Sequence, residues 1–367
     1  MDLKAIMIKG GQKVFSGLYV KDNPLVIPDK NTPDCENILT NNPIGALVNI
    51  EGMEKQRTTA YNNDIVGIHQ LNERGRFGDG SIYSNDGDID IPLNNPGDVV
   101  IAESFVWICN NFILIPPPRK RRIEVVNLTA SSYWNFGSYG SGDGQFEWTS
   151  SLEVYGSEIY VTDGSLNRVQ VFNLEGTYQR KWGSSGSGDG EFNSCNGISI
   201  YNDEVYVVDS GNSRIQVFDL NGNYVRKWGS LGGGNGAFRI PLGLFVYNNE
   251  VYVADQSNIR IQVFDLNGNF DRKWGSFGAG DGDFGLFIRD VYVYNDEVYV
   301  TDSGNSRIQV FDTAGNYVRK WGSGGAGDGE LNGAEGIFVY NGEVYVADAG
   351  NNRIQVFDLN GVYYRQF

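Results

Sequence analysis

Residues 197–228 read GISIYNDEVYVVDSGNSRIQVFDLNGNYVRKW, four short apolar runs separated by turn residues. Each run has the length of an ordinary β-strand. An Asn-Asp dipeptide separates the first two runs and an Asn-Gly dipeptide separates the last two, and both dipeptides favour tight hairpin turns. The stretch therefore predicts four consecutive antiparallel strands.

The same unit recurs at a nearly fixed spacing along the C-terminal two thirds of the chain. Four Trp-Gly-Ser motifs open at positions that fall 46, 46 and 47 residues apart: Trp182, Trp228, Trp274 and Trp321. The second and third strands of each unit are apolar on both faces, so both faces of each sheet must be covered. Radial stacking of the sheets covers both faces and explains the period. We therefore predict an all-β protein, a β-propeller of four-stranded antiparallel blades.

The repeat resembles the NHL family. The signature Val-Tyr-Val-x-Asp, Arg-Ile-Gln-Val-Phe-Asp and Asn-Gly stands at residues 205–222, 251–268, 298–315 (with Ala314 in place of Asn) and 344–361, and in looser form at 159–176. A sixth, degenerate unit aligns Phe112-Ile-Leu-Ile with residues 159–162, Arg122–Leu128 with residues 168–174, and Tyr133-Trp134 with Lys181-Trp182. The resemblance implies six blades within residues 95–367. A hairpin-like stretch at residues 65–84 leaves a seventh blade open.

Composition agrees with many short strands and tight turns, because the chain has 49 glycines and only 10 prolines. Cys35, Cys109 and Cys195 lie far apart without a CxxC spacing, which favours reduced thiols over a disulfide framework or a zinc knuckle. The first residues lack the pattern of a signal peptide, and no apolar run is long enough to span a bilayer. We expect synthesis and retention in a cytoplasm.

The net charge of −16 is concentrated in the repeats. Residues 1–135 carry 13 basic and 16 acidic side chains, whereas residues 136–367 carry 16 basic and 29 acidic ones. An acidic surface repels phosphates. Tight nucleic-acid binding by the repeats is therefore not expected, although DNA could pass without specific binding.

Each of the five clear units places an aspartate five residues before an arginine, across the loop between the second and third strands. A charged ring around a ligand-binding mouth and a repeated loop-locking ion pair both explain this pattern. The second interpretation is favoured, because a catalytic site breaks symmetry and this pattern does not. The pairs are Asp163 with Arg168, Asp209 with Arg214, Asp255 with Arg260, Asp302 with Arg307, and Asp348 with Arg353.

The sequence offers no convincing catalytic, cofactor or metal site. The Gly-x-Gly motifs in the loops between units each centre on one acidic or amide residue, which turn chemistry explains: Asp143, Asp189, Asn235, Asp281 and Asp328. Residues 86–90 resemble the start of a calcium loop but lack its glycine and its later glutamate. His69 is the single histidine, whereas metal-dependent enzymes on propeller scaffolds use several. We predict a protein that is not an enzyme and has no cofactor.

Two features break the repeat. Pro116–Pro118 is followed by four cations, Arg119, Lys120, Arg121 and Arg122, in a loop that could contact an acidic partner or nucleic acid or could simply be exposed. One unit gains a residue near Phe287 and places Arg289-Asp290 in its innermost strand, for which the sequence suggests no reason.

Residues 1–60 do not match the repeat and form an extended, Pro-punctuated segment. Its order of residues is similar to the start of bacteriophage tail nozzle and hub proteins, in which such an arm leads into a propeller. The likeness implies an assembly arm at 1–60, a hairpin-like segment at 61–94 and the propeller at 95–367. The arm residues that carry it are Gly17, Leu18, Lys21, Pro24, Pro28, Asp29, Glu36 and Asn37.

Together the two resemblances imply a non-enzymatic virion structural protein, a nozzle or hub subunit of a phage tail or neck around the DNA exit path. Such a subunit would form a homo-oligomeric ring and contact tail, neck or portal-adaptor proteins through the arm and the cationic loop. Its location would be the virion tail, after synthesis in the host cytoplasm. A binding module for a glycan, peptide or host receptor at the propeller mouth is the main alternative. An RNA-binding propeller is disfavoured by charge.

Overall fold

The computed structural model describes residues 93–102, 104–111, 121–128 and 132–367, and three short strands nearer the N-terminus. The chain divides into two units, Met1–Asp90 and Ile91–Phe367. In the first unit, β1 (Lys4–Ile6), β2 (Gly17–Val20) and β3 (Asn23–Leu25) pair antiparallel in that order. Gly17, Leu18 and Pro24 lie in these strands. Outside the described residues lie the other predicted arm contacts, residues 65–84, His69, residues 86–90, Arg119 and Lys120.

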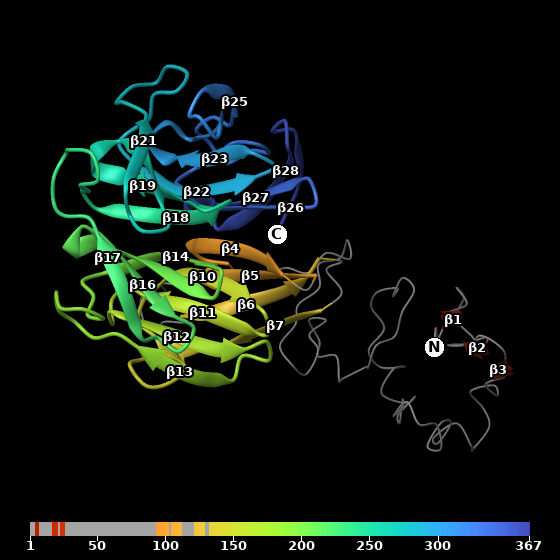
Figure 1. Cartoon of the computed structure of the whole chain (residues 1–367). Helices are drawn as coiled ribbons and strands as arrows, with labels where there is room; N and C mark the ends of the chain where they lie inside the picture. Colours follow the sequence, from red (N-terminus) through yellow and green to blue (C-terminus); the bar gives the residue numbers. More distant parts are fainter. Residues whose placement is uncertain are drawn as a thin grey trace. The chain divides into compact units, whose positions relative to one another are not determined.

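The second unit consists of six antiparallel sheets, each built from four consecutive strands (Figure 1). We number these blades in chain order. Blade 1 consists of β4 (Pro96–Ala102), β5 (Phe105–Asn110), β6 (Arg122–Asn127) and β7 (Tyr133–Phe136). Blade 2 consists of β10 (Thr149–Tyr155), β11 (Glu158–Asp163), β12 (Arg168–Asn173) and β13 (Tyr178–Trp182). Blade 3 consists of β14 (Cys195–Tyr201), β15 (Glu204–Asp209), β16 (Arg214–Asp219) and β17 (Tyr224–Trp228).

Blade 4 consists of β18 (Pro241–Tyr247), β19 (Glu250–Asp255), β20 (Arg260–Asp265) and β21 (Phe270–Trp274). Blade 5 consists of β22 (Ile288–Tyr294), β23 (Glu297–Asp302), β24 (Arg307–Asp312) and β25 (Tyr317–Trp321). Blade 6 consists of β26 (Ala334–Tyr340), β27 (Glu343–Asp348), β28 (Arg353–Asp358) and β29 (Tyr363–Gln366). A parallel pair, β8 (Ser138–Tyr139) and β9 (Gln145–Phe146), lies between blades 1 and 2. Single 3-10 turns follow the second strands of blades 3 to 6: η2 (Ser210–Asn212), η3 (Gln256–Asn258), η4 (Ser303–Asn305) and η5 (Ala349–Asn351).

The first strand of every blade lies nearest the axis and contacts the first strand of the next blade. The ring closes where β26 of blade 6 contacts β4 of blade 1, visible in Figure 1 as blue beside orange. The prediction of an all-β propeller with six four-stranded blades is thus confirmed. In the part of the chain that the structure describes, no helix could cross a membrane.

The hydrophobic core is divided among the spaces between blades. One buried cluster, for example, joins Tyr206 and Val208 of blade 3 to Val251 and Val253 of blade 4. Four further clusters combine neighbouring blades in the same way. Each sheet is therefore covered on both faces, which explains why its central strands are apolar throughout.

An aromatic ring and a glycine join each of blades 1 to 5 to the next blade. Gly222 has a φ of +85°, and a Cβ at this position would lie 2.5 Å from the ring of Trp182 in the preceding blade. Glycine is required here both by the backbone conformation and by the close ring. The same contact recurs between Phe136 and Gly176, Trp228 and Gly268, Trp274 and Gly315, and Trp321 and Gly361.

The alignment of the degenerate blade from sequence was wrong in two places. Its second strand is β5 (Phe105–Asn110), which pairs with β6 along its whole length; the stretch that begins at Phe112 lies outside the described residues. Phe136, not Trp134, pairs with Ile123 and takes the position of the later tryptophans. The apolar run at residues 112–115 was aligned with a second strand because it has the composition of one.

The paired charges of the fourth strands do more than protect an outer edge. Arg226 donates to both carboxylate oxygens of Glu204 at 2.5 and 2.7 Å, and to the backbone oxygen of Leu266 in the next blade at 2.9 Å. Its neighbour Lys227 pairs with Asp189 of the preceding Gly-rich loop. The arginine therefore clamps two blades together, and the lysine holds the loop. Equivalent clamps form at Arg180, Arg272 and Arg319.

Candidate functional site

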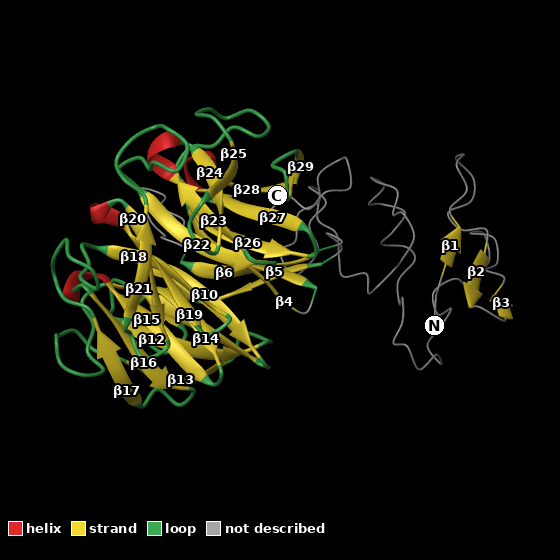
Figure 2. Ribbon diagram, turned by 45° about the horizontal axis from the view of Figure 1, so that its top comes forward, coloured by secondary structure: helices red, strands yellow, loops and turns green. Residues whose placement is uncertain are grey.

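The five Asp-Arg pairs form ion pairs in the loops at one end of the blades, where Figure 2 shows the short 3-10 helices. Arg214 Nε lies 2.7 Å from Asp209, and both side chains are buried. The remaining nitrogens of Arg214 donate to the carbonyls of Ser187, Gly188 and Glu191 in the preceding Gly-rich loop. Each pair thus fixes two loops of the same face to one another.

Blade 1 has an equivalent of this pair with the groups exchanged. Asn110 stands where the other blades have the aspartate, and Glu124 stands where they have a glutamine. Arg122 Nε lies 2.5 Å from Glu124, and Asn110 donates to the same carboxylate at 2.7 Å. The carboxylate has moved from the second strand to the third, so the loop keeps its ion pair in all six blades.

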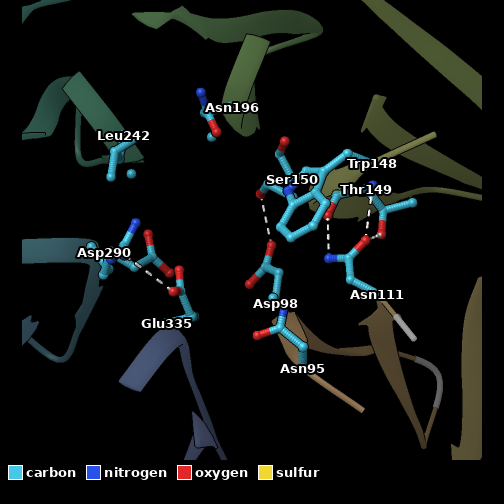
Figure 3. A pocket seen from close by; sticks show the side chains of 16 residues that line it. Asn95, Asp98, Asn111, Trp148, Thr149, Ser150, Asn196, Leu242, Asp290 and Glu335 are labelled. Atoms are coloured by element: carbon cyan, nitrogen blue, oxygen red, sulfur yellow. Dashed lines mark hydrogen bonds and ion pairs between the residues drawn. The ribbon is translucent and has the colours of Figure 1, made fainter. Parts of the chain in front are cut away.

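A pocket of about 320 Å³ opens on this face at the propeller axis (Figure 3). The starts of all six first strands contribute to its wall. Its volume lies at the lower end of the range for small-molecule sites, which fits a group the size of one side chain.

The residues that line the pocket do not follow the repeat. At the first axial position, blades 1 to 6 carry Gly97, Ser150, Asn196, Leu242, Arg289 and Glu335. At the second, they carry Asp98, Ser151, Gly197, Gly243, Asp290 and Gly336. The second and third strands of blades 2 to 6 are, in contrast, nearly identical in sequence. The asymmetry that a specific site requires is therefore concentrated at the axis.

A β-bulge places these side chains. In every blade the pairing of the first and second strands shifts by one residue at the axial positions, as between Cys195 and Ile198 in blade 3. A bulge bends the strand locally and redirects side chains, and bulges are frequent beside functional sites.

Two aspartates join neighbouring blades at the second axial position. Asp98 accepts hydrogen bonds from Ser151 Oγ at 2.7 Å and from the backbone N–H of Leu152 at 3.0 Å, both in blade 2. Asp290 accepts from the N–H of Ile337 in blade 6 at 3.1 Å. Glycine on the opposite neighbour makes room, since a Cβ at Gly336 would lie 2.4 Å from Asp98. Asp290, for which the sequence suggested no role, is thus both a blade contact and a pocket residue.

The pocket is strongly acidic. Burial raises the pKa of Asp98 to about 6, and burial together with the charge of Asp98 raises the pKa of Asp290. Burial also raises the pKa of Glu335, although Arg289 at 3.5 Å counteracts it. One layer deeper, burial and the two aspartates raise the pKa of Glu153 to about 8. These carboxyls are held close together with a single arginine among them, so a bound cation would stabilise their ionised forms.

Amide and aromatic groups form the other side. Figure 3 shows Asp290 and Glu335 across the pocket from Trp148, Thr149 and Asn111. Asn111 donates to the carbonyl of Thr149 at 2.8 Å and accepts from its backbone N–H and hydroxyl. The guanidinium of buried Arg121 stacks 4.7 Å from the centre of the Trp148 ring. This wall is therefore held rigidly.

The predicted cationic loop is only partly described. Arg121 donates to the carbonyl of Asn111 at 2.5 Å and is 4% exposed, while Arg122 pairs with Glu124. Both side chains are engaged within the propeller, which leaves them less available to a partner than the sequence suggested. In residues 93–367, apart from the undescribed gaps, no cluster of three His, Cys, Asp or Glu side chains could hold a metal ion.

These features define the described second unit as a six-bladed β-propeller with an asymmetric axial pocket. A family model described as a 6-bladed beta-propeller matches residues 143–229 and 283–366. No curated protein matches the chain by sequence. The NHL resemblance and the tail-protein resemblance therefore gain no support beyond the shared propeller fold.

Similar solved structures are propellers of low sequence identity. Virginiamycin B lyase from Staphylococcus aureus is 14% identical, with a TM-score of 0.53 over 76% of this chain and 86% of that one. A protein of unknown function from Bacteroides thetaiotaomicron is 14% identical, with a TM-score of 0.56 over 76% and 72%. A chain of a nidogen/laminin complex is 15% identical, with a TM-score of 0.50 over 67% and 89%. At these identities the likeness shows the fold alone.

Sequence reasoning missed most of the pocket. Asp98, Asn111, Trp148, Glu153 and Glu335 were not among the predicted site residues. The interpretation of the charged positions considered the recurring loops and not the axial strands. Comparing the six first strands position by position would have revealed one column without a consensus and a second with glycine in three blades and aspartate in two.

Proposed function

We propose that this propeller is a binding module whose axial pocket holds a cationic group, such as a guanidinium or ammonium, of the size of one side chain. The observation that carries the proposal is that the pocket at the axis, where the repeat breaks down, is lined by three carboxyl groups and a single arginine. Binding of this kind needs no catalysis.

Electrostatics supports a cation over an anion or a neutral sugar. Asp98, Asp290 and Glu335 supply three carboxyl groups against the one positive charge of Arg289. Their raised pKa values favour the neutral forms without a cation, and a bound cation would favour the ionised ones. The repeats as a whole are acidic, which attracts cations toward the mouth and repels phosphates. Across the pocket from Asp290 and Glu335 lies the ring of Trp148, which already stacks with the guanidinium of Arg121, and aromatic faces attract cations.

The test is calorimetric titration with blocked arginine, using blocked citrulline as an uncharged ligand of nearly the same shape. Arginine is expected to bind and citrulline to bind at least about tenfold more weakly, because a charged hydrogen bond contributes about 1.5 to 3 kcal/mol. Glu335→Gln should reduce arginine affinity by a similar factor. Glu175→Gln, at an exposed turn of blade 2, is the matched control. Equal affinity for the two ligands would refute the proposal.

A second candidate is a non-enzymatic subunit of a phage tail, nozzle or hub, in a homo-oligomeric ring that DNA passes without specific binding. It rests on the resemblance of residues 1–60 to tail proteins and on the acidic propeller. The expected partners remain other tail, neck or portal-adaptor proteins. Mass spectrometry of purified virions and native mass measurement of the full chain test it. Absence from the virion, or a strictly monomeric mass beside its neighbours, would count against it.

A further inference from the structure

Exposed apolar side chains gather on the pocket face of blades 4 and 5. Five of the ten large apolar side chains that are exposed in the described residues lie in the loops that lead into these two blades. We call them the apolar ledge: Leu231, Ile240, Phe277, Leu286 and Phe287, which are 76%, 51%, 69%, 57% and 47% exposed.

The residue at the first ledge position differs among the other blades. Blade 2 carries Tyr139, which is 40% exposed, at the position of Leu231. Leu231 and Phe277 take the position that Ser185 has in blade 3 and Gly324 has in blade 6. Each of these four residues forms a parallel β-bridge with a buried residue seven positions later in the chain. The repeat can therefore build this loop with small or polar residues. Folding does not explain why blades 4 and 5 carry large apolar ones.

Ile240 is held in a conformation that isoleucine disfavours. Its φ is +48°, in the left-handed region, and the equivalent residues Asn95, Ser194 and Gly333 share that region. A β-branched side chain in this region is a genuine outlier, and such strain concentrates at functional sites. An isoleucine that is strained and half exposed contributes little to the core, which points to a role at the surface.

The ledge adjoins the pocket in blade 5. The guanidinium of Arg289 lies 5.5 Å from the centre of the Phe287 ring, and Arg289 also lines the pocket. In blade 4 the two are close along the chain, since Leu242, two residues after Ile240, lines the pocket. A ligand seated in the pocket therefore lies next to apolar surface at Phe287.

From this continuity we infer that the partner is an extended peptide segment with one basic side chain in the pocket and apolar side chains on the ledge. The inference rests on the proposed function, because the basic side chain is the cation that the pocket holds. The carboxyl groups of the pocket favour a basic side chain as the group that enters it. The ledge offers apolar surface next to the pocket, which the apolar side chains of the peptide would bury on binding. In an extended peptide alternate side chains point to the same side, so apolar residues two and four positions from the basic one would meet the ledge.

The experiment compares blocked peptides of sequence Arg-Ser-Leu-Ser-Phe and Arg-Ser-Ser-Ser-Ser, their reversed sequences, and blocked arginine alone, by titration against the full chain. We expect the apolar peptide, in one of the two directions, to bind at least tenfold more tightly than the serine peptide. The ledge variant Leu231→Ser, Ile240→Asn and Phe277→Ser should remove that difference and keep the affinity for blocked arginine. Its substitutions use residues found in other blades or tolerant of the same backbone, so it should fold.

Each outcome separates the two proposals. Equal affinity for both peptides and for blocked arginine would overturn the peptide inference while leaving the cationic pocket intact. Failure of blocked arginine to bind at all would overturn both. Apolar peptides that bind the ledge variant as well as the natural protein would show that the ledge is not the surface they use. Binding to vesicles, lost in the same variant and independent of arginine, would favour a membrane over a peptide and also refute the inference.

Discussion

Replacing Glu153 by glutamine is expected to stabilise the propeller at neutral and alkaline pH and to have little effect at acidic pH. Glu153 lies at the axis beneath Asp98 and Asp290, and its pKa is raised from 4.5 to about 8, first by burial and then by these two aspartates. Glutamine has the same size and no charge. The change therefore removes the cost of ionising the buried carboxyl while keeping the axial packing.

The sign follows from proton counting. Between pH 4.5 and about 8 the folded protein keeps a proton on Glu153 that the unfolded chain has released, so stability falls as pH rises. Each pH unit is worth about 1.4 kcal/mol, which gives about 4 to 5 kcal/mol over the whole interval. Glu153 retains part of its surface exposed along the axis. Water screening should reduce the measured effect to about 2 to 4 kcal/mol.

The assay is urea unfolding followed by tryptophan fluorescence at pH 5, 6, 7 and 8, with Glu175→Gln as the control for an exposed glutamate. The natural protein should lose free energy of unfolding relative to Glu153→Gln at each step, and the control should follow the natural protein. Two parallel curves for the natural protein and Glu153→Gln would refute the reasoning, because they would mean that Glu153 does not titrate differently in the folded state.

Three other substitutions test the scaffold. Gly222→Ala should lower the free energy of unfolding by about 2 to 3 kcal/mol, because the new methyl group would meet the Trp182 ring. Gly156 also has a positive φ but open space around it, so Gly156→Ala should lower the free energy by only about 1 kcal/mol. Equal losses would exclude the ring contact as the cause. Asp209→Ala removes the carboxylate that pairs with buried Arg214 and should lower the free energy of chemical unfolding by about 3 to 5 kcal/mol. The control Asp189→Ala removes an exposed ion pair and should lower it by less than about 1 kcal/mol. Ile240→Asn should raise the free energy of unfolding by about 1 kcal/mol, since it relieves the left-handed isoleucine; a loss would mean that Ile240 packs usefully.

The fold could be read from the sequence because its causes are local and repeated. Asn202 and Asp203 both have positive φ, as a two-residue hairpin turn requires, and the dipeptide alone predicts that turn. The fixed spacing of the units, together with strands that are apolar on both faces, was enough to predict that the blades stack around a central axis. The alignment of the degenerate blade was wrong because two apolar runs, at residues 105–109 and 112–115, both suit a second strand. The pairing register, which decides between them, is not visible in one sequence.

The pocket could not be predicted in the same way, because its residues come from all six blades and are far apart in the sequence. Asp98 and Asp290 are separated by most of the propeller sequence, and only ring closure brings blade 1 next to blade 6 and near blade 5. The irregular Arg289-Asp290 pair was the one local sign. Its role becomes clear from the hydrogen bond of Asp290 to Ile337 and from the ion pair of Arg289 with Glu335.

The most direct test of the cationic pocket is a crystal structure of the full chain grown with blocked arginine. We expect a guanidinium within hydrogen-bond distance of the carboxylates of Asp290 or Glu335 at the axis, and loss of that density in Glu335→Gln crystals grown under the same conditions. Arginine bound elsewhere on the acidic surface, with the axial pocket empty, would contradict this expectation.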